Sequence, residues 1–301
     1  MELWIPVTIG AAFVQNLRFM LQKHLQATRL SAAGATFARS LFAAPLAGLV
    51  IAVRLVAGGS ALPEMNAGFL IHGGIGAIAQ LLATLCVVAL FGARNFAVGI
   101  TFKKTEVVLA AVAGYLILGE AVSGMGIFAI LAGLAGVLLL SVTPTAAFGT
   151  GISQLLDRAS LLGLGAGLLF AVSAVNFRGA LLSLSGGDLF LRAVFSVLCV
   201  TAFQSLILGL WLGLRQPGEI GRVLRHWRVT GLVGLASILG TTGWFLAFSL
   251  QSAAYVKALG QIELVFSYLA TRFVFRERSS PRELVAMGLI VLSILLLILA
   301  L

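Results

Sequence analysis

Ionisable side chains inside long apolar segments are the residues of this chain best placed to do chemistry. Glu106 and Glu263 each lie near the middle of an apolar run, and Lys103 and Lys104 lie within one helical turn of Glu106. An ionised side chain in the hydrocarbon core of a membrane costs roughly 2.5–3.5 kcal/mol on insertion scales, so such groups usually face a cavity or pair with one another. We therefore expect these residues to line an interior site.

Helix geometry separates the two lysines. Lys103 and Glu106 are spaced i, i+3, so they share a helical face and can pair. Lys104 points about 200° away from Glu106 at 3.6 residues per turn, and it needs a different partner or faces the cavity. In the second half of the chain, Gln261 and Glu263 take the positions of Lys104 and Glu106.

Basic side chains outnumber acidic ones at these depths. Two arginines, Arg39 and Arg192, join the two lysines against two glutamates. A cavity with that bias favours a carboxylate or a phosphate, so we expect an anionic or zwitterionic metabolite: an amino acid, an organic acid or a phosphate ester. The expected substrate-binding residues are Lys103, Lys104, Arg39, Arg192, Gln261, Lys257, Trp244 and Tyr255.

Two roles remain open for Glu106 and Glu263. Each carboxylate can carry a coupling proton in competition with substrate, or it can pair with a basic residue of a neighbouring helix and fix the packing. The packing role is equally open for Arg39 and Arg192. Long side chains near the ends of spans can reach the membrane surface, and three basic residues lie there: Arg18, Arg178 and Lys257.

Composition excludes a water-soluble enzyme. Of 301 residues, 60% are hydrophobic and 10% charged, with a mean hydropathy of +1.10, whereas soluble domains carry about 25% charged residues. The net charge of +10 indicates basic loops beside a membrane rather than a nucleic-acid partner. Cys86 and Cys199 form no disulfide framework. The histidines lack metal-ligand spacing, and no nucleotide or hydrolase motif occurs, so we expect no metal, no cofactor and no enzyme.

Apolar segments of about 20 residues predict an all-α polytopic membrane protein with ten transmembrane helices. The segments are 3–21, 32–53, 67–91, 95–117, 122–142, 160–183, 189–213, 229–250, 253–275 and 282–301. They divide the chain into a first five-helix unit (1–143), a linker (144–159) and a second five-helix unit (160–301).

The two units resemble each other. Glu106 and Glu120 are 14 residues apart, as are Glu263 and Glu277, and an offset of 157 relates the pairs. Arg39 and Arg192 each stand in a Phe-x-Arg-x-x-Phe pattern. Further repeat-equivalent polar pairs are Asn16 with Asn176 and Arg18 with Arg178. Five crossings per unit invert the second copy, and inverted repeats place a central site near the bilayer midplane.

The ends of the fourth and ninth segments carry a family resemblance. Leu118-Gly119-Glu120 precedes a glycine-rich run, and Phe275-Arg276-Glu277 precedes Gly288. Together with the repeat, these residues resemble the drug/metabolite transporter superfamily in its ten-span EamA-like branch. The resemblance covers essentially the whole chain. It implies transport of small metabolites by alternating access, although family members often carry a proline where this chain has Lys104-Thr105-Glu106.

We therefore expect a secondary transporter, an exporter or exchanger, in a bacterial-type inner membrane. A flippase for a lipid or lipid-linked precursor with an anionic headgroup is the alternative. Connections after the odd-numbered spans hold most of the basic residues, so the positive-inside rule places both termini outside. The expected partners are a small-molecule substrate and the lipid bilayer. One chain is large enough to enclose a cavity, and a homodimer is left open.

Overall fold

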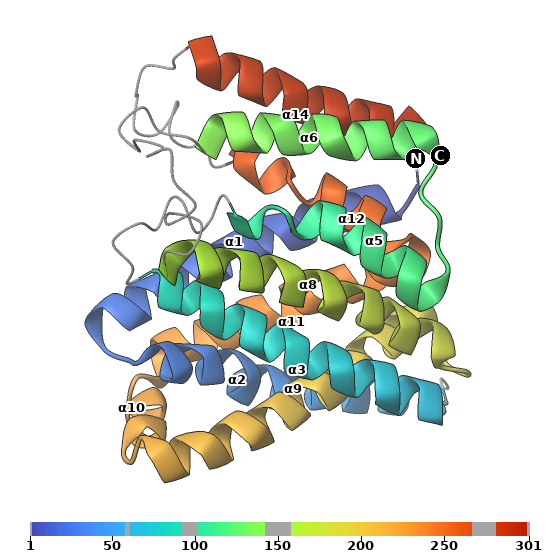
Figure 1. The fold of residues 1–301 in the computed structure, drawn as a ribbon. Coiled ribbons are helices and arrows are strands. Elements are labelled where there is room, and N and C mark those ends of the chain that lie inside the picture. Colours follow the sequence, from blue (N-terminus) through green and yellow to red (C-terminus); the bar gives the residue numbers. More distant parts are fainter. Residues whose placement is uncertain (1, 58–60, 92–101, 142–157, 267–280, 300–301) are drawn as a thin grey trace.

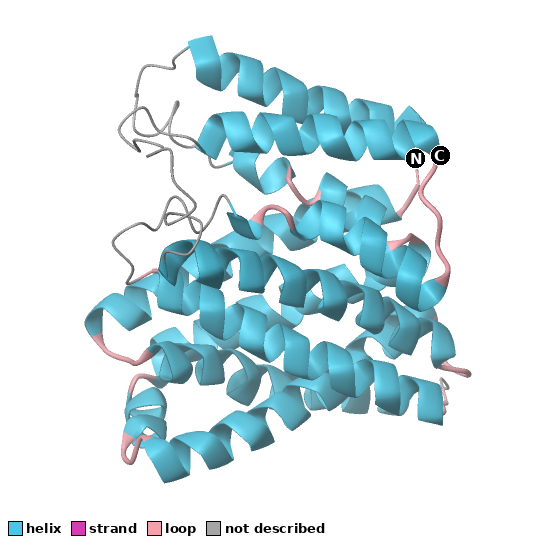
Figure 2. Ribbon diagram, viewed as in Figure 1, coloured by secondary structure: helices cyan, strands magenta, loops and turns pink. Residues whose placement is uncertain are grey.

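The fold is helical throughout the part of the chain that the computed structural model describes, which comprises residues 2–57, 61–91, 102–141, 158–266 and 281–299 (Figures 1 and 2). Within these ranges the β-structure is limited to an isolated bridge between Glu64 and Ser185. The predicted all-α class is confirmed. Most of the linker 144–159 lies outside the described residues.

Five helices are long and apolar enough to cross a membrane by length and composition. They are α2 (Ala32–Val56), α3 (Ala67–Leu90), α8 (Arg158–Ser183), α9 (Leu189–Arg215) and α11 (Trp227–Leu250). The remaining helices are α1 (Trp4–Thr28), α5 (Glu106–Leu118), α6 (Gly124–Ser141), α10 (Glu219–Arg225), α12 (Ala253–Leu259) and α14 (Pro281–Leu299). Large apolar side chains such as Leu70, Leu206 and Leu210 are each 62% exposed, as expected for faces that meet lipid.

Polar side chains cap the starts of three long helices, and a glycine ends α5. The side chain of Ser31 accepts a hydrogen bond from Gly34 N (3.0 Å), that of Asn66 from Phe69 N (2.9 Å) and that of Asp188 from Leu191 N (2.7 Å). These caps satisfy backbone N–H groups that a helix start leaves without partners. Gly119, with φ of 68°, ends α5 in the left-handed conformation that glycine adopts without strain.

The helices pack as a bundle of nearly side-by-side rods (Figure 1). The closest pairs are α3 with α8, α1 with α11, α2 with α9 and α6 with α14, while α5 also packs on α8 and α12 also contacts α1. Both chain termini lie at one end of the bundle, and α10 lies at the other. The core between these helices positions the charged residues.

Two predicted spans are not single continuous helices. The segment 95–117 is described only from residue 102 and has a turn at Lys104 and Thr105 before α5 begins; the segment 253–275 is described only to residue 266 and has a turn at Gly260 and Gln261 after α12 ends. At each turn, a hydrogen bond that spans three residues replaces the four-residue bond of an α-helix.

Candidate functional site

The two turns interrupt the helical hydrogen-bond ladder in the same way. Thr105 N donates to Phe102 O (3.2 Å), and Gln261 N donates to Ala258 O (3.1 Å). Both bonds span three residues instead of four, which is the tighter pattern of a 3₁₀ turn. Mid-helix turns of this kind often mark functional positions, because they release backbone groups and redirect side chains.

Glycine allows close packing at both turns. A Cβ atom on Gly167 of α8 would lie 2.9 Å from Lys103 O and 3.0 Å from Thr105 Oγ1. A Cβ atom on Gly260 would lie 2.6 Å from the nearest ring atom of Trp244. Both separations are below ordinary carbon contacts, so the missing side chains let each turn approach its neighbour.

Two ion pairs form at the turns. Lys103 Nζ lies 3.6 Å from Glu106 Oε1, the pairing that the i, i+3 spacing allows. Lys104 points elsewhere and pairs with Glu263. The second pair joins the α5 segment to the segment that follows α12, which are 159 residues apart in the chain. All four side chains are at most 15% exposed.

Aromatic rings contact two of the central lysines. Lys257 Nζ lies 4.9 Å from the ring centroid of Trp244 and 5.4 Å from that of Phe170. Lys103 Nζ lies 5.3 Å from the same Phe170 ring. The face of an aromatic ring attracts a cation, more strongly when water is excluded. Lys257 has no hydrogen-bonded or ion-paired partner among the described residues.

Arg18 of α1 belongs to the same buried centre. Its guanidinium lies 4.7 Å from the ring centroid of Phe19, and it is close enough to Lys103 to repel it. Arg18 is 4% exposed and Lys257 is 8% exposed. The expectation that these two side chains reach the membrane surface is therefore wrong. Depth along a helix does not reveal which face turns inward, and both residues lie on inward faces.

The charges of this centre do not balance. We call Arg18, Lys103, Lys104, Lys257, Glu106 and Glu263 the central charge cluster. It holds four cations and two carboxylates, a net charge of +2 at neutral pH. Beside these charges, three buried polar atoms find no hydrogen-bond partner in the ranges that the structure describes: Glu106 Oε2, Gln261 Oε1 and Trp244 Nε1. An uncompensated buried charge costs several kcal/mol, and an added negative charge would lower that cost.

Arg39 occupies a second buried polar position. Its Nη1 donates to Thr84 Oγ1 (3.1 Å), and its Nη2 donates to Gln204 Oε1 (3.0 Å) and to Gln80 Oε1. These bonds connect α2, α3 and α9, and all three acceptors are neutral. Arg39 neighbours Arg18 across the contact between α1 and α2, where Gln22 Nε2 donates to Ala35 O (3.1 Å) one turn away from each arginine.

Two expected binding residues make their hydrogen bonds with residues outside the central charge cluster. Arg192 Nε donates to Gly186 O (2.8 Å), because side chains in the first turn of a helix lean back towards its start. This corrects the expected depth of Arg192. The hydroxyl of Tyr255 is hydrogen-bonded to Ser123 Oγ (3.0 Å), which ties α12 to the start of α6.

The repeat-equivalent polar residues have different surroundings. Arg178 pairs with Glu120 and donates to the carbonyls of Phe248 (2.6 Å) and Gln251 (2.8 Å). It therefore ties α8 to the ends of α5 and α11 rather than reaching the membrane surface, as its position near a span end had suggested. Asn176 Oδ1 lies 3.0 Å from His72 Nδ1, and its counterpart Asn16 is half-buried on α1.

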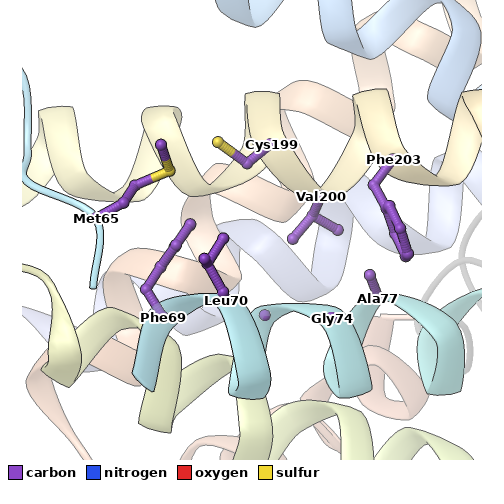
Figure 3. Close-up of a pocket in the computed structure, with 9 residues that line it drawn as sticks. Met65, Phe69, Leu70, Gly74, Ala77, Cys199, Val200 and Phe203 are labelled. Atoms are coloured by element: carbon purple, nitrogen blue, oxygen red, sulfur yellow. The ribbon is translucent and has the colours of Figure 1, made fainter. Parts of the chain in front are cut away.

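Two apolar grooves lie outside the central charge cluster. One, of about 370 Å³, lies between α3 and α9, where Phe69, Leu70 and Phe203 line it (Figure 3). The other, of about 450 Å³, lies between α5 and α6. No residue of the cluster lines either groove, so they are apolar surface features rather than the charged site.

Sequence reasoning missed the aromatic rings of Phe170 and Phe19. Both stand within apolar segments, where a phenylalanine that contacts a cation looks like any other core residue. It also missed the close approach of Gly167. No local signal identifies these residues, because their contacts come from other helices.

No family model matches the chain, and no curated protein matches it. Among solved structures, the chain is similar to a protein given only as "Crystal structure of protein", with a TM-score of 0.71 and 15% sequence identity over 98% of this chain and 95% of that chain. At this identity the likeness concerns the fold alone.

Proposed function

We propose that the protein is a secondary transporter that moves a small anionic or zwitterionic metabolite across a membrane by alternating access. The observation that carries this proposal is the central charge cluster. Six ionisable side chains gather around the two interrupted helices with a net charge of +2; five of them are buried, and the side chain of Glu263 is 15% exposed. Ionisable residues at membrane depth are costly and mark substrate or ion pathways.

The positions of the two turns support a pair of inverted five-helix repeats. Lys104 and Gln261, which stand in the turns, are related by the offset of 157 that also relates Glu106 to Glu263. Transporters with inverted repeats place their sites at discontinuous helices in corresponding positions of the two halves. This chain resembles that pattern without the prolines common in the drug/metabolite transporter superfamily.

The helix packing agrees with the same proposal. If α1, α2, α3, α5 and α6 correspond in order to α8, α9, α11, α12 and α14, exchanging the halves turns the α3–α8 contact into the α1–α11 contact. The α5–α8 contact becomes the α12–α1 contact, while α2–α9 and α6–α14 map onto themselves. Both termini lie at one end, as an even number of spans requires. We propose ten.

The Lys104–Glu263 pair suggests how ligand binding acts on conformation. In the proposed arrangement this pair joins the two repeats. An anion that binds Lys104 competes with Glu263 and weakens the contact between the halves. A ligand shifts a conformational equilibrium only by its differential affinity for the two states, and this competition supplies such a difference.

The test begins with the purified protein in detergent. Thermal unfolding is measured with amino acids, organic acids, phosphate esters and anionic lipids, because a ligand that prefers the folded state raises the melting temperature. We expect a water-soluble anion or zwitterion to stabilise the protein. Stabilisation by the anionic lipids alone would replace the transporter with a lipid flippase.

Transport of the stabilising solute is then measured in proteoliposomes. Replacing Lys103 and Lys104 together by Met should abolish saturable uptake, whereas Arg225→Met on exposed α10 removes one positive charge outside the cluster and should leave it unchanged. Lys103→Arg with Lys104→Arg keeps both charges and controls for misfolding. Full uptake by the double Met variant would refute the proposal.

A further inference from the structure

We propose that Arg18 and Arg39 form a second anion-binding site beside the central lysines, and that the substrate therefore carries two separate acid groups. We call Arg18 and Arg39 the arginine site. This inference rests on the proposed transport function and makes its substrate class specific. It starts from Arg39, a buried cation outside the central charge cluster.

Both arginines are buried, and neither has a counter-charge within the described part of the chain. Arg39 is 1% exposed and Arg18 is 4% exposed, and the Nε atom of each has no hydrogen-bond partner. No carboxylate among the described residues hydrogen-bonds or pairs with either side chain. Gln22 Nε2, one helical turn after Arg18, donates to Ala35 O (3.1 Å), one helical turn before Arg39, so the contact between α1 and α2 brings the two arginines to neighbouring positions. A buried charge without a partner is strongly unfavourable, and two such charges of one sign are more so.

The side chains around Arg39 hold it in place without neutralising it. Thr84, Gln80 and Gln204 accept from its Nη atoms, while Gln204 Nε2 donates to Ala77 O (2.8 Å). Neutral acceptors fix the plane of the guanidinium and leave its full positive charge. A fixed guanidinium with a remaining N–H group suits a carboxylate or phosphate oxygen, which arginine recognises through directed, charge-assisted bonds.

The charge balance favours a dianion. With Arg39 included, five buried cations face the two carboxylates of Glu106 and Glu263, a net charge of +3. A zwitterion leaves +3 and a monoanion leaves +2, whereas a dianion leaves +1. Among these ligands, the dianion compensates the most buried charge.

The arrangement of the cations calls for two acid groups rather than one. Arg18 and Lys103 lie 4.7 Å and 5.9 Å from the ring centroid of Phe19, while Arg18 also neighbours Arg39 through the contact between α1 and α2. Lys103 and Lys257 in turn contact the same Phe170 ring. One acid group of the substrate then binds at the central lysines Lys103, Lys104 and Lys257, and the other at the arginine site. A dicarboxylate has this form.

Matched ligand pairs test the proposal on the purified, full-length protein. Affinities are measured from thermal shifts and calorimetry for succinate against butyrate, glutamate against glutamine, and succinate against twice its concentration of acetate. We expect each dianion or second acid group to improve affinity by about tenfold or more, as one added charged hydrogen bond does. The acetate comparison distinguishes one molecule with two acid groups from two separate monoanions.

Variants assign that preference to the arginine site. Arg39→Gln, or independently Arg18→Gln if the first fails to fold, should remove the preference for succinate and retain butyrate binding. Arg54→Gln removes one positive charge from the exposed Arg54–Asp188 pair outside the site and should retain the preference. Equal affinity for succinate and butyrate, or an unchanged ratio in both Gln variants, would overturn the inference while leaving an anion transporter in place. Absence of binding by every anion in the panel would overturn the proposed function as well.

Discussion

Replacing Glu263 by Gln should destabilise the protein more than replacing its partner Lys104 by Met. Both changes break the same buried ion pair, but they move the net charge of the cluster in opposite directions. Lys104→Met leaves three cations facing two carboxylates. Glu263→Gln leaves four cations facing one carboxylate. The second change adds to an excess that is already present.

The magnitudes follow from what surrounds each partner. Removing one member of a buried pair costs about 3–5 kcal/mol when the other charge is left uncompensated, and we expect Glu263→Gln to fall in that range. After Lys104→Met, Lys103 and Lys257 are still close enough to attract Glu263, so the cost should stay below about 3 kcal/mol. The double variant should be less destabilised than Glu263→Gln alone, with a coupling of about 1–3 kcal/mol.

The free energy of unfolding is measured by reversible denaturation in mixed micelles, followed by far-UV circular dichroism. The exposed Arg54–Asp188 pair, whose side chains are 45% and 42% exposed, is the matched control, and Arg54→Met should cost no more than about 1 kcal/mol. Equal costs for the two cluster variants, or a larger cost for Lys104→Met, would refute the charge-excess reasoning. A coupling near zero would show that the pair contributes nothing.

Three further predictions concern packing, pH and orientation. Gly167→Ala should lower the free energy of unfolding by about 1–3 kcal/mol through overpacking, because the new Cβ would lie 2.9 Å from a backbone oxygen. The control Gly165→Ala, whose Cβ would have nothing within 4 Å, should not destabilise the protein. Equal melting temperatures for the two variants would contradict this prediction. The hydrogen bond from Leu191 N, helped by Arg54, holds the pKa of Asp188 below its ordinary value. The ionised Asp188 side chain therefore contributes to stability above the ordinary Asp pKa of about 3.9, and this contribution is lost as the pH falls through the lower pKa of the folded state. Asp188→Asn should flatten the acid side of the plot of unfolding free energy against pH. An unchanged plot would contradict this prediction. A reporter that works only in the cytoplasm should be inactive at the C-terminus, because the termini lie at the end opposite the basic α10; activity would reverse the proposed orientation.

The positions of the long helices were predictable from apolar length alone. The segment 32–53 corresponds to α2, and 160–183 to α8, with ends that differ by a few residues. The turn at Lys104 and Thr105 was not predictable, since no glycine or proline interrupts that stretch. Its causes are tertiary: an ion pair to a distant segment and close packing on α8. The second turn has a local signal in Gly260.

The candidate site was predictable where its geometry is local. Lys103 and Glu106 pair because three residues separate them on one helix. The partner of Lys104 depends on which helix lies opposite, and the burial of Arg18 depends on how α1 is rotated against its neighbours. Neither is encoded in a short stretch of residues. The match between Arg39 and Arg192 likewise identifies a sequence pattern, but it did not predict their different surroundings.

The two interrupted helices also have a mechanical consequence. A continuous helix resists bending because each residue is hydrogen-bonded to the turn before it. A segment whose hydrogen bonds span three residues instead of four can bend with the loss of fewer hydrogen bonds. Lys104 sits at one of these compliant joints, and Glu263 sits immediately after the other. The Lys104–Glu263 ion pair between the distant segments thus acts at the two turns themselves, so a ligand that weakened this pair would act first on the flexible points of both helices.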